Sequence, residues 1–153
     1  MYERLRDKAA QQGISIYEKP LPKRIKGLYA DNFIWINREI PTTSEKACIL
    51  AEELGHYHTT AGDITDQSST NNRKQERKAR LWAYEKLVPL AKIVQAHRAR
   101  VASRHELAEY LGVTEEFLQS ALTRYKEKYG PYKTIGQYTI RFEPLGVLEM
   151  LED

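Results

Sequence analysis

The sequence predicts an α+β protein: a small antiparallel sheet, then a pair of long helices, then a helix-turn-helix-like C-terminal half with a β-hairpin. Three observations predict this class. Short apolar runs between residues 14 and 36 are typical of strands, helical spacing of apolar residues from about 43 to 88 predicts the helix pair, and short helices follow from residue 101. We expect two regions, residues 1–100 and 101–153, with the second packed on the first.

Composition narrows the class of protein. The 153 residues are 41% hydrophobic and 29% charged, which is ordinary for a chain that buries a core. No apolar run approaches the roughly 18 to 20 residues that span a bilayer, and we expect a cytoplasmic protein without membrane association. The single cysteine, Cys48, excludes an internal disulfide and an all-cysteine metal cage.

The net charge of +3 is unevenly distributed along the chain. Residues 71–104 carry ten basic residues against two acidic ones, a local charge of +8. Such a segment is typical of a solvated basic helix face, and it also suits an acidic protein or nucleic acid as partner. Charge alone does not separate these readings.

The first half of the chain contains residues that mark where helices and strands begin and end. Gly13 ends a helix that begins near Tyr2, and strands over 14–17, 25–29 and 33–36 follow, with a turn at residues 31–32. We expect the strand over 33–36 to lie at a sheet edge, where it can pair with an extended segment of a substrate. Thr42 and Glu45 have the spacing of a capping box, which predicts a helix over 43–59.

In the second half, helices are predicted on either side of residues 112–114, then a hairpin around residues 136–137 and a terminal helix over 145–151. The helices have the apolar and glycine spacing of a helix-turn-helix. Their second member begins with Glu115 and Glu116, which DNA phosphates would repel. Sequence-specific DNA binding is therefore disfavoured relative to packing or protein docking.

The helix over 43–59 carries the residues with the clearest chemistry. Glu52, Glu53 and His56 follow the spacing of the HExxH metallopeptidase motif, with Glu52 in place of the first histidine. Residues 52 and 56 lie about 40° apart around a helix, and a carboxylate is an accepted zinc ligand. Glu53 then occupies the position of the general base that activates the attacking water. Gly55 leaves room for close approach by a neighbouring element.

A third metal ligand is predicted on the second long helix. Glu76 heads an apolar stripe there, where it can either complete a metal site or stabilise the helix N-terminus. Asp63 and Asp66 are competing candidates. His58 lies about 200° from His56 around the helix and cannot share its ion, and neither His97 nor His105 is given a role.

These residues carry a resemblance to a known family. The run from Glu52 to His56, followed by Glu76, Ala79, the Trp82-Ala83 pair, Leu87 and Pro89, resembles the ImmA/IrrE family of metallo-endopeptidases. That family has an HELGH helix, then a Glu followed by Ala, an aromatic-Ala pair, Leu and a closing Pro. The segments around residues 26–29, 35–37 and 143–148 resemble its phage and mobile-element members.

The resemblance implies a function and a site. It implies a zincin-like metal-binding fold for the two long helices and a zinc-dependent endopeptidase that cleaves a helix-turn-helix repressor of a prophage or mobile element encoded beside it. Because Glu52 would make the ligand set rich in carboxylates, manganese is a possible metal as well. By the same analogy His56 and Glu76 are metal ligands, Glu52 stands where the family has histidine, and Glu53 is the catalytic base. The alternative is a weakly active or inactive relative that works by binding the repressor or DNA. The sequence leaves the oligomeric state open.

Overall fold

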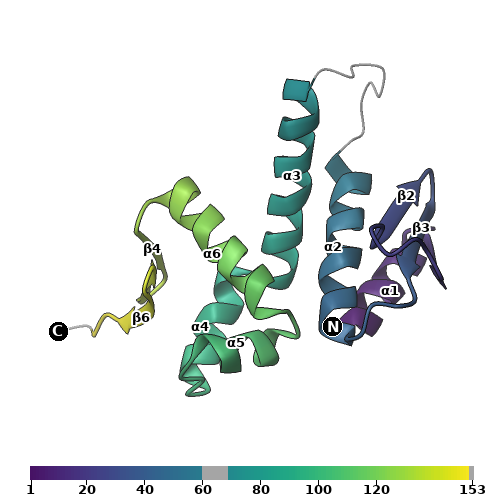
Figure 1. The fold of residues 1–153 in the computed structure, drawn as a ribbon. Coiled ribbons are helices and arrows are strands. Elements are labelled where there is room, and N and C mark those ends of the chain that lie inside the picture. The colour runs from purple at the N-terminus through teal and green to yellow at the C-terminus, as the bar shows by residue number, and fades with distance from the viewer. Residues whose placement is uncertain (60–68, 152–153) are drawn as a thin grey trace. The chain divides into compact units, whose positions relative to one another are not determined.

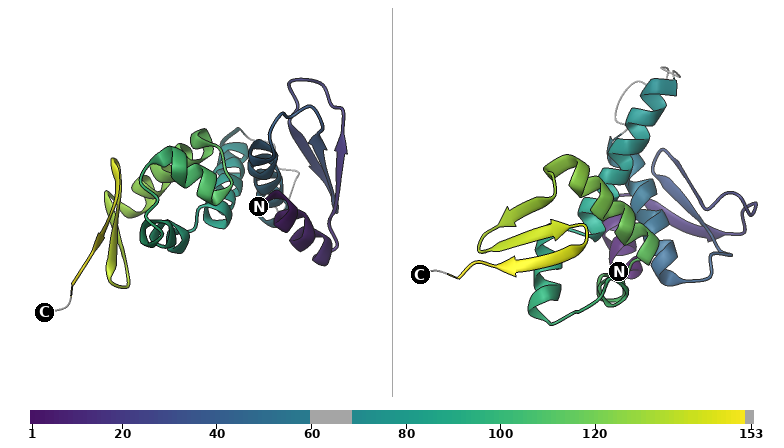
Figure 2. Two further views of the ribbon diagram at one scale, coloured as in Figure 1. Left: turned by 90° about the horizontal axis from the view of Figure 1, so that it is seen from below. Right: turned by 60° about the vertical axis from the view of Figure 1, so that its left-hand side comes forward.

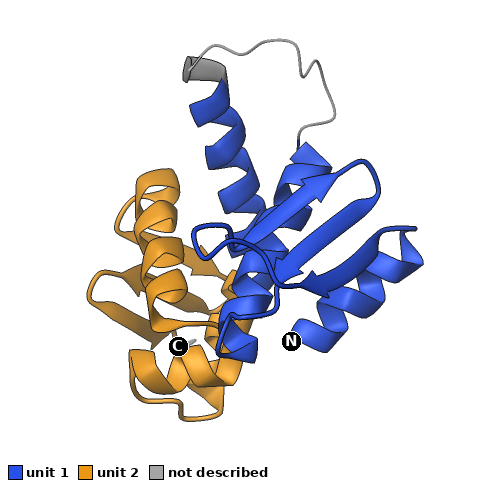
Figure 3. Ribbon diagram, turned by 45° about the vertical axis from the view of Figure 1, so that its right-hand side comes forward, with its two compact units in different colours: residues 1–87 blue, residues 88–153 orange. Residues whose placement is uncertain are grey.

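The computed structural model describes residues 1–59 and 69–151 (Figure 1). It divides into two compact units, residues 1–87 and residues 88–153 (Figure 3). Each unit carries its own helices and one three-stranded sheet. The chain is therefore α+β as predicted, and the division falls after Leu87. No helix within the described ranges has both the length and the apolar character needed to cross a membrane.

The sheet of the first unit is mixed. It comprises β1 (Ser15–Lys19), β2 (Gly27–Ala30) and β3 (Phe33–Asn37) in the order β1-β3-β2. β3 pairs with β1 in parallel and with β2 antiparallel, through the expected turn at residues 31–32. The antiparallel pairing predicted around this turn is confirmed for β2 and β3, whereas the prediction that the strand over 33–36 lies at a sheet edge was wrong. β3 is central because β1 pairs along its other side, a long-range contact without a local sequence signal.

Both sheet-covering helices of this unit lie on one side of the sheet (Figure 2). They are α1 (Tyr2–Gln11) and α2 (Thr43–Thr59), which contact each other and the strands. Ile34 and Ile36 of β3 are buried on that side, together with Leu50 of α2. Thr42 caps α2 as predicted, because its hydroxyl accepts a hydrogen bond from the Glu45 amide at 3.1 Å.

The close packing of α2 against α3 (Ser69–Leu87) depends on one glycine. A Cβ placed on Gly55 would lie 2.2 Å from the backbone oxygen of Ala79. No real contact is that short, so only glycine permits this helix separation. Ala79 and Ala83 are fully buried along the same interface. The sequence therefore brings the carboxylates and imidazole of α2 next to α3.

The second unit places three helices beside an antiparallel sheet. The helices are α4 (Leu90–Arg98), α5 (Arg104–Leu111) and α6 (Glu115–Tyr129), and the strands are β4 (Tyr132–Ile135), β5 (Tyr138–Phe142) and β6 (Leu145–Glu149). The predicted cap at Thr114 is confirmed, since its hydroxyl accepts from the Phe117 amide. The hairpin around residues 136–137 is also confirmed. The predicted terminal helix was wrong, because residues 145–149 pair with β5.

Aromatic packing holds this unit together. Tyr125 of α6 is buried and donates its hydroxyl hydrogen to the carbonyl of Val88 at 2.8 Å. Its ring lies near those of Tyr129 and Phe142, which ties α6 to β5. These contacts form part of the hydrophobic core of the second unit.

Candidate active site

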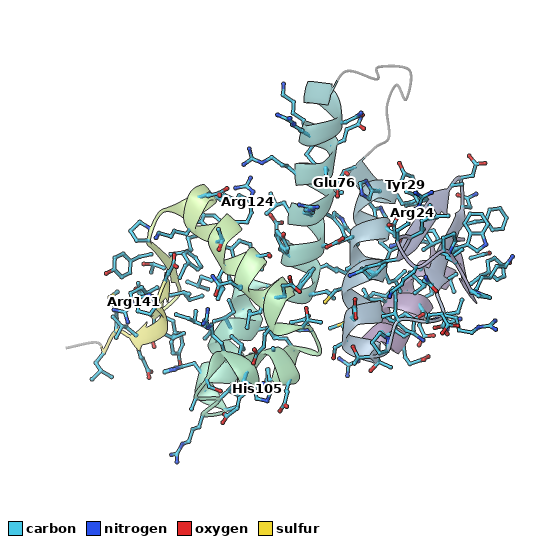
Figure 4. The ribbon with its side chains drawn as sticks, in the orientation of Figure 1. Arg24, Tyr29, Glu76, His105, Arg124 and Arg141 are labelled. Atoms are coloured by element: carbon cyan, nitrogen blue, oxygen red, sulfur yellow. The ribbon has the colours of Figure 1, made fainter. Side chains whose placement is uncertain are left out.

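The site is centred on a contact between α2 and α3. Nε2 of His56 lies 3.1 Å from Oε2 of Glu76. The two residues come from different helices, so the close approach permitted by Gly55 brings them together. Two of the three ligands predicted from the sequence are thus in direct contact. Figure 4 labels Glu76 on α3 and Tyr29 on β2, the elements on either side of α2.

Glu53 points toward the sheet. A Cβ placed on Gly27 of β2 would lie 3.1 Å from Cγ of Glu53 and 3.3 Å from its Oε1. The glycine therefore lets this strand pass close to the carboxyl group. Burial, reinforced by repulsion from Glu52 and Glu76, raises the pKa of Glu53 to about 7. A carboxyl group with that pKa exchanges protons readily at neutral pH.

Glu52 lies one helical turn before His56. Burial raises the pKa of Glu52, and the charge of Glu76 raises it further, while Arg80 and Lys26 act in the opposite direction. Three carboxyl groups from two helices thus share a partly buried region. Their charged forms repel one another, so the region favours a cation.

Arg80 supplies one such cation from within the chain. Its Nε lies 3.3 Å from Oε1 of Glu76, one turn away on α3. Glu76 therefore contacts His56 with one oxygen and Arg80 with the other. Both side chains are partly exposed, so the Arg80–Glu76 pair contributes little to stability. Its importance is electrostatic, because Arg80 places positive charge beside the carboxylate of Glu76.

Tyr29 is a site residue that the sequence did not single out. Its ring stacks on His56 with a centroid separation of 5.4 Å and an interplanar angle of 6°. The stacking restricts the orientation of the imidazole. Tyr29 faces α2 because it is paired with Ile34 in the sheet, a register that only the fold defines.

The donor set fits a divalent metal in part. Zinc bonds of about 2.0–2.2 Å in tetrahedral geometry separate two ligand atoms by roughly 3.3–3.5 Å. The 3.1 Å between His56 and Glu76 is close to this value. Among the described residues, however, no group of three or more His, Cys, Asp or Glu side chains is drawn together tightly enough to hold an ion. Glu52 is near the pair without completing a closed set of ligands.

Other aspartates and histidines were also considered as candidates from the sequence. Asp63 and Asp66 lie outside the described residues. His58 stacks on Trp82 with a centroid separation of 4.9 Å. In the second unit, His97 lies against Tyr138, and His105 contacts Glu109 and Glu115.

Comparison with known protein families gives a match that covers the residues of this site. A family model described as Peptidase_M78, IrrE N-terminal-like domain, matches residues 9–123. The match covers about three quarters of the chain and includes α2, α3 and every candidate site residue. A search of the curated proteins found no match.

Proposed function

Because this chain belongs to the Peptidase_M78 family of IrrE N-terminal-like domains, we propose that it is a metal-dependent endopeptidase that cleaves a helix-turn-helix repressor of a prophage or mobile element. The observation that carries the proposal is the His56–Glu76 contact beside Glu53. It joins an imidazole, a carboxylate and a candidate base at one helix pair, as the chemistry of a metallopeptidase requires.

The residues have distinct roles in this proposal. Glu52, His56 and Glu76 hold the ion, which is zinc or manganese. The ion would supply Lewis acidity, polarising the scissile carbonyl and lowering the pKa of water. Glu53 takes the proton of the attacking water and delivers it to the departing amine. Tyr29 keeps the imidazole of His56 in place by stacking on it.

The β2 strand gives a path for the substrate. Within the described part of the chain, β2 pairs with β3 alone, so its other edge is available. Gly27 lies against Glu53 and Tyr29 against His56, so β2 runs alongside the site. An extended repressor segment that pairs with this edge would cross the site with its backbone held by main-chain hydrogen bonds.

Cleavage of the repressor tests this function. The purified chain, supplied with Zn²⁺ or Mn²⁺, is incubated with the helix-turn-helix repressor encoded beside its gene, and products are identified by mass spectrometry. We expect cleavage at one site, and its loss in Glu53→Gln with metal still bound. The matched control is Glu85→Gln, because Glu85 is an exposed acidic residue on α3. An intact repressor under all these conditions would contradict the proposal.

Arg80 favours a second candidate function. An arginine that neutralises Glu76 and opposes the charge of Glu52 can satisfy these carboxylates without a metal. The chain would then bind the repressor without cutting it. A stable complex with an intact repressor, seen by size-exclusion chromatography, would support this candidate. DNA binding by the second unit remains disfavoured, because Glu115 and Glu116 are exposed at the start of α6.

A further inference from the structure

The side of the first sheet that faces away from α1 and α2 carries a row of apolar side chains, which we call the outer face. It comprises Tyr17, Leu28, Phe33 and Trp35. The strand register places Tyr17 and Leu28 on either side of Trp35, while Phe33 lies two residues along β3. Tyr17 is 44% exposed, Leu28 43% and Phe33 42%. Soluble proteins rarely leave several large side chains exposed together without a binding role.

The rings of the outer face are arranged side by side. The Tyr17 and Phe33 centroids lie 6.2 Å apart with an interplanar angle of 23°, and those of Phe33 and Trp35 lie 6.0 Å apart at 19°. Nearly parallel rings at this separation are strongly offset. Each therefore leaves part of its π-face uncovered, and flat aromatic groups can stack on such surfaces.

Positive charge borders this row. Residues 19–26 contain four basic residues, Lys19, Lys23, Arg24 and Lys26, and no acidic one. Nζ of Lys19 lies 5.8 Å from the Tyr17 ring centroid. Glu18, the acidic residue of β1, is on the opposite side of the sheet, where its carboxylate binds Lys46 at 2.5 Å. Lys26 is paired with Glu45 of α2 at 3.1 Å, so Lys19, Lys23 and Arg24 are the exposed cations that this segment offers to a ligand of the outer face.

A buried asparagine holds the basic segment at the end of the outer face. Asn37 follows Trp35 by two residues and is only 3% exposed. Its amide nitrogen donates to the carbonyls of Leu21 at 3.1 Å and Ile25 at 2.9 Å. These bonds order the loop that carries Lys23 and Arg24. The loop is therefore held at the end of β3, two residues from Trp35, with Lys23 and Arg24 exposed on it.

We propose that the outer face binds single-stranded nucleic acid, with bases stacked on Tyr17, Phe33 and Trp35 and phosphates held by Lys19, Lys23 and Arg24. Three offset rings in a row suit successive bases, since every base has a π-face, and the bordering cations complement the phosphate backbone. An acidic peptide would match the charge but would leave the row of rings without a partner. The proposal does not depend on the peptidase function, so Glu53→Gln should bind nucleic acid as well as the unaltered chain does.

Tryptophan fluorescence and anisotropy test the proposal. The chain has two tryptophans, so Trp82→Phe leaves Trp35 as the single reporter. Oligodeoxythymidine of about 12 nucleotides, within the length that single-strand binding modules cover, is titrated at roughly 50 and 200 mM salt. We expect quenching of Trp35, and binding that weakens strongly as salt rises. Binding to duplex of the same length should be weaker, because its bases are already stacked.

Matched variants distinguish stacking from charge attraction. Tyr17→Ala and Phe33→Ala should each weaken binding roughly five- to 150-fold, and Phe33→Trp should restore it. Tyr110→Ala, an equally exposed ring in the second unit, should have no effect. The double variant Lys23→Gln/Arg24→Gln should reduce both the affinity and the salt dependence, whereas Arg4→Gln/Lys8→Gln on α1 should not.

Three results would overturn the proposal. They are the absence of Trp35 quenching at the lower salt, an affinity unaffected by both alanine variants while circular dichroism shows them folded, and equally tight binding of polyglutamate. The last would identify an acidic peptide as the occupant of the outer face.

Discussion

Nε2 of His56 and Oε2 of Glu76 lie 3.1 Å apart, although twenty residues separate them in the sequence. Helical geometry places His56 one turn from Glu52, and the close packing of α2 on α3 places Glu76 beside it. That packing relies on Gly55, whose missing side chain leaves room for the Ala79 carbonyl. The candidate chemistry of the site therefore depends on a packing feature of the first unit.

Gly55→Ala should destabilise the first unit. The added Cβ would lie 2.2 Å from the Ala79 oxygen, so one helix must move. Forced overpacking of this kind costs about 1–3 kcal/mol of the free energy of unfolding. Urea denaturation followed by circular dichroism measures the change. The control is Gly146→Ala, whose Cβ would meet nothing closer than 3.5 Å. Equal stabilities of the two variants would contradict this account of the helix packing.

Arg80→Gln should strengthen binding of divalent cations. Arg80 contacts Glu76 and lowers the pKa of Glu52, so it competes with a cation for both carboxylates. Removing one partly screened charge should lower the dissociation constant for Mn²⁺ several-fold. Calorimetric titration checks this, with Lys78→Gln on the exposed side of α3 as control. If Arg80→Gln binds the ion more weakly, Arg80 supports the site instead of competing for it.

Glu52→His should tighten zinc binding. A shell of two carboxylates and one imidazole brings a divalent site formally to zero charge, whereas one carboxylate and two imidazoles leave it at +1. Imidazole suits zinc, while carboxylate-rich shells also accept harder ions such as manganese. We expect the ratio of zinc to manganese affinity to rise in this variant, measured by competition with a chromogenic chelator. An unchanged ratio would show that Glu52 is not a ligand.

His105 should contribute more to the stability of the second unit in mild acid than in mild base. The hydrogen bond that the His105 imidazole donates to the Glu115 carboxylate, together with the charges of Glu109 and Glu115, raises the pKa of His105. A pKa raised by folding contributes stability below the unfolded value and loses it as pH rises through the folded value. His105→Gln should therefore lower the melting temperature more at about pH 5.5 than at about pH 8.5. His97→Gln, with its ring contact to Tyr138, is the control imidazole. A pH-independent difference would contradict the proposed ion pairing.

Local signals allowed much of the fold to be predicted. Thr42 marks the start of α2, Thr114 that of α6, and the turn at residues 136–137 the hairpin, because caps and turns act over a few residues. The central position of β3 and the strand character of residues 145–149 were missed, since both depend on pairing between strands. A leucine-rich segment such as residues 145–151 is compatible with either a helix or a strand on local sequence alone.

The side chains that lie together in the candidate site were predictable to a similar degree. Helical spacing indicated Glu52, Glu53 and His56, and the apolar stripe of α3 indicated Glu76. The stacking of Tyr29 on His56 and the approach of Gly27 to Glu53 were missed, because they follow from the register of β2 against β3 and its packing on α2. Alternating apolar residues indicate that a strand exists without showing which neighbour each side chain meets.

Metal content is the most direct test of the claim that α2 and α3 form a metallopeptidase site. Protein purified without chelator and supplied with Zn²⁺ or Mn²⁺ is analysed by elemental mass spectrometry beside His56→Ala, Glu76→Gln and the control Glu85→Gln. The account predicts one divalent ion per chain in the unaltered protein and the control, and a large loss of metal in the other two variants. A folded, unaltered protein that binds no ion, or one whose bound metal is unaffected by both site variants, would contradict it.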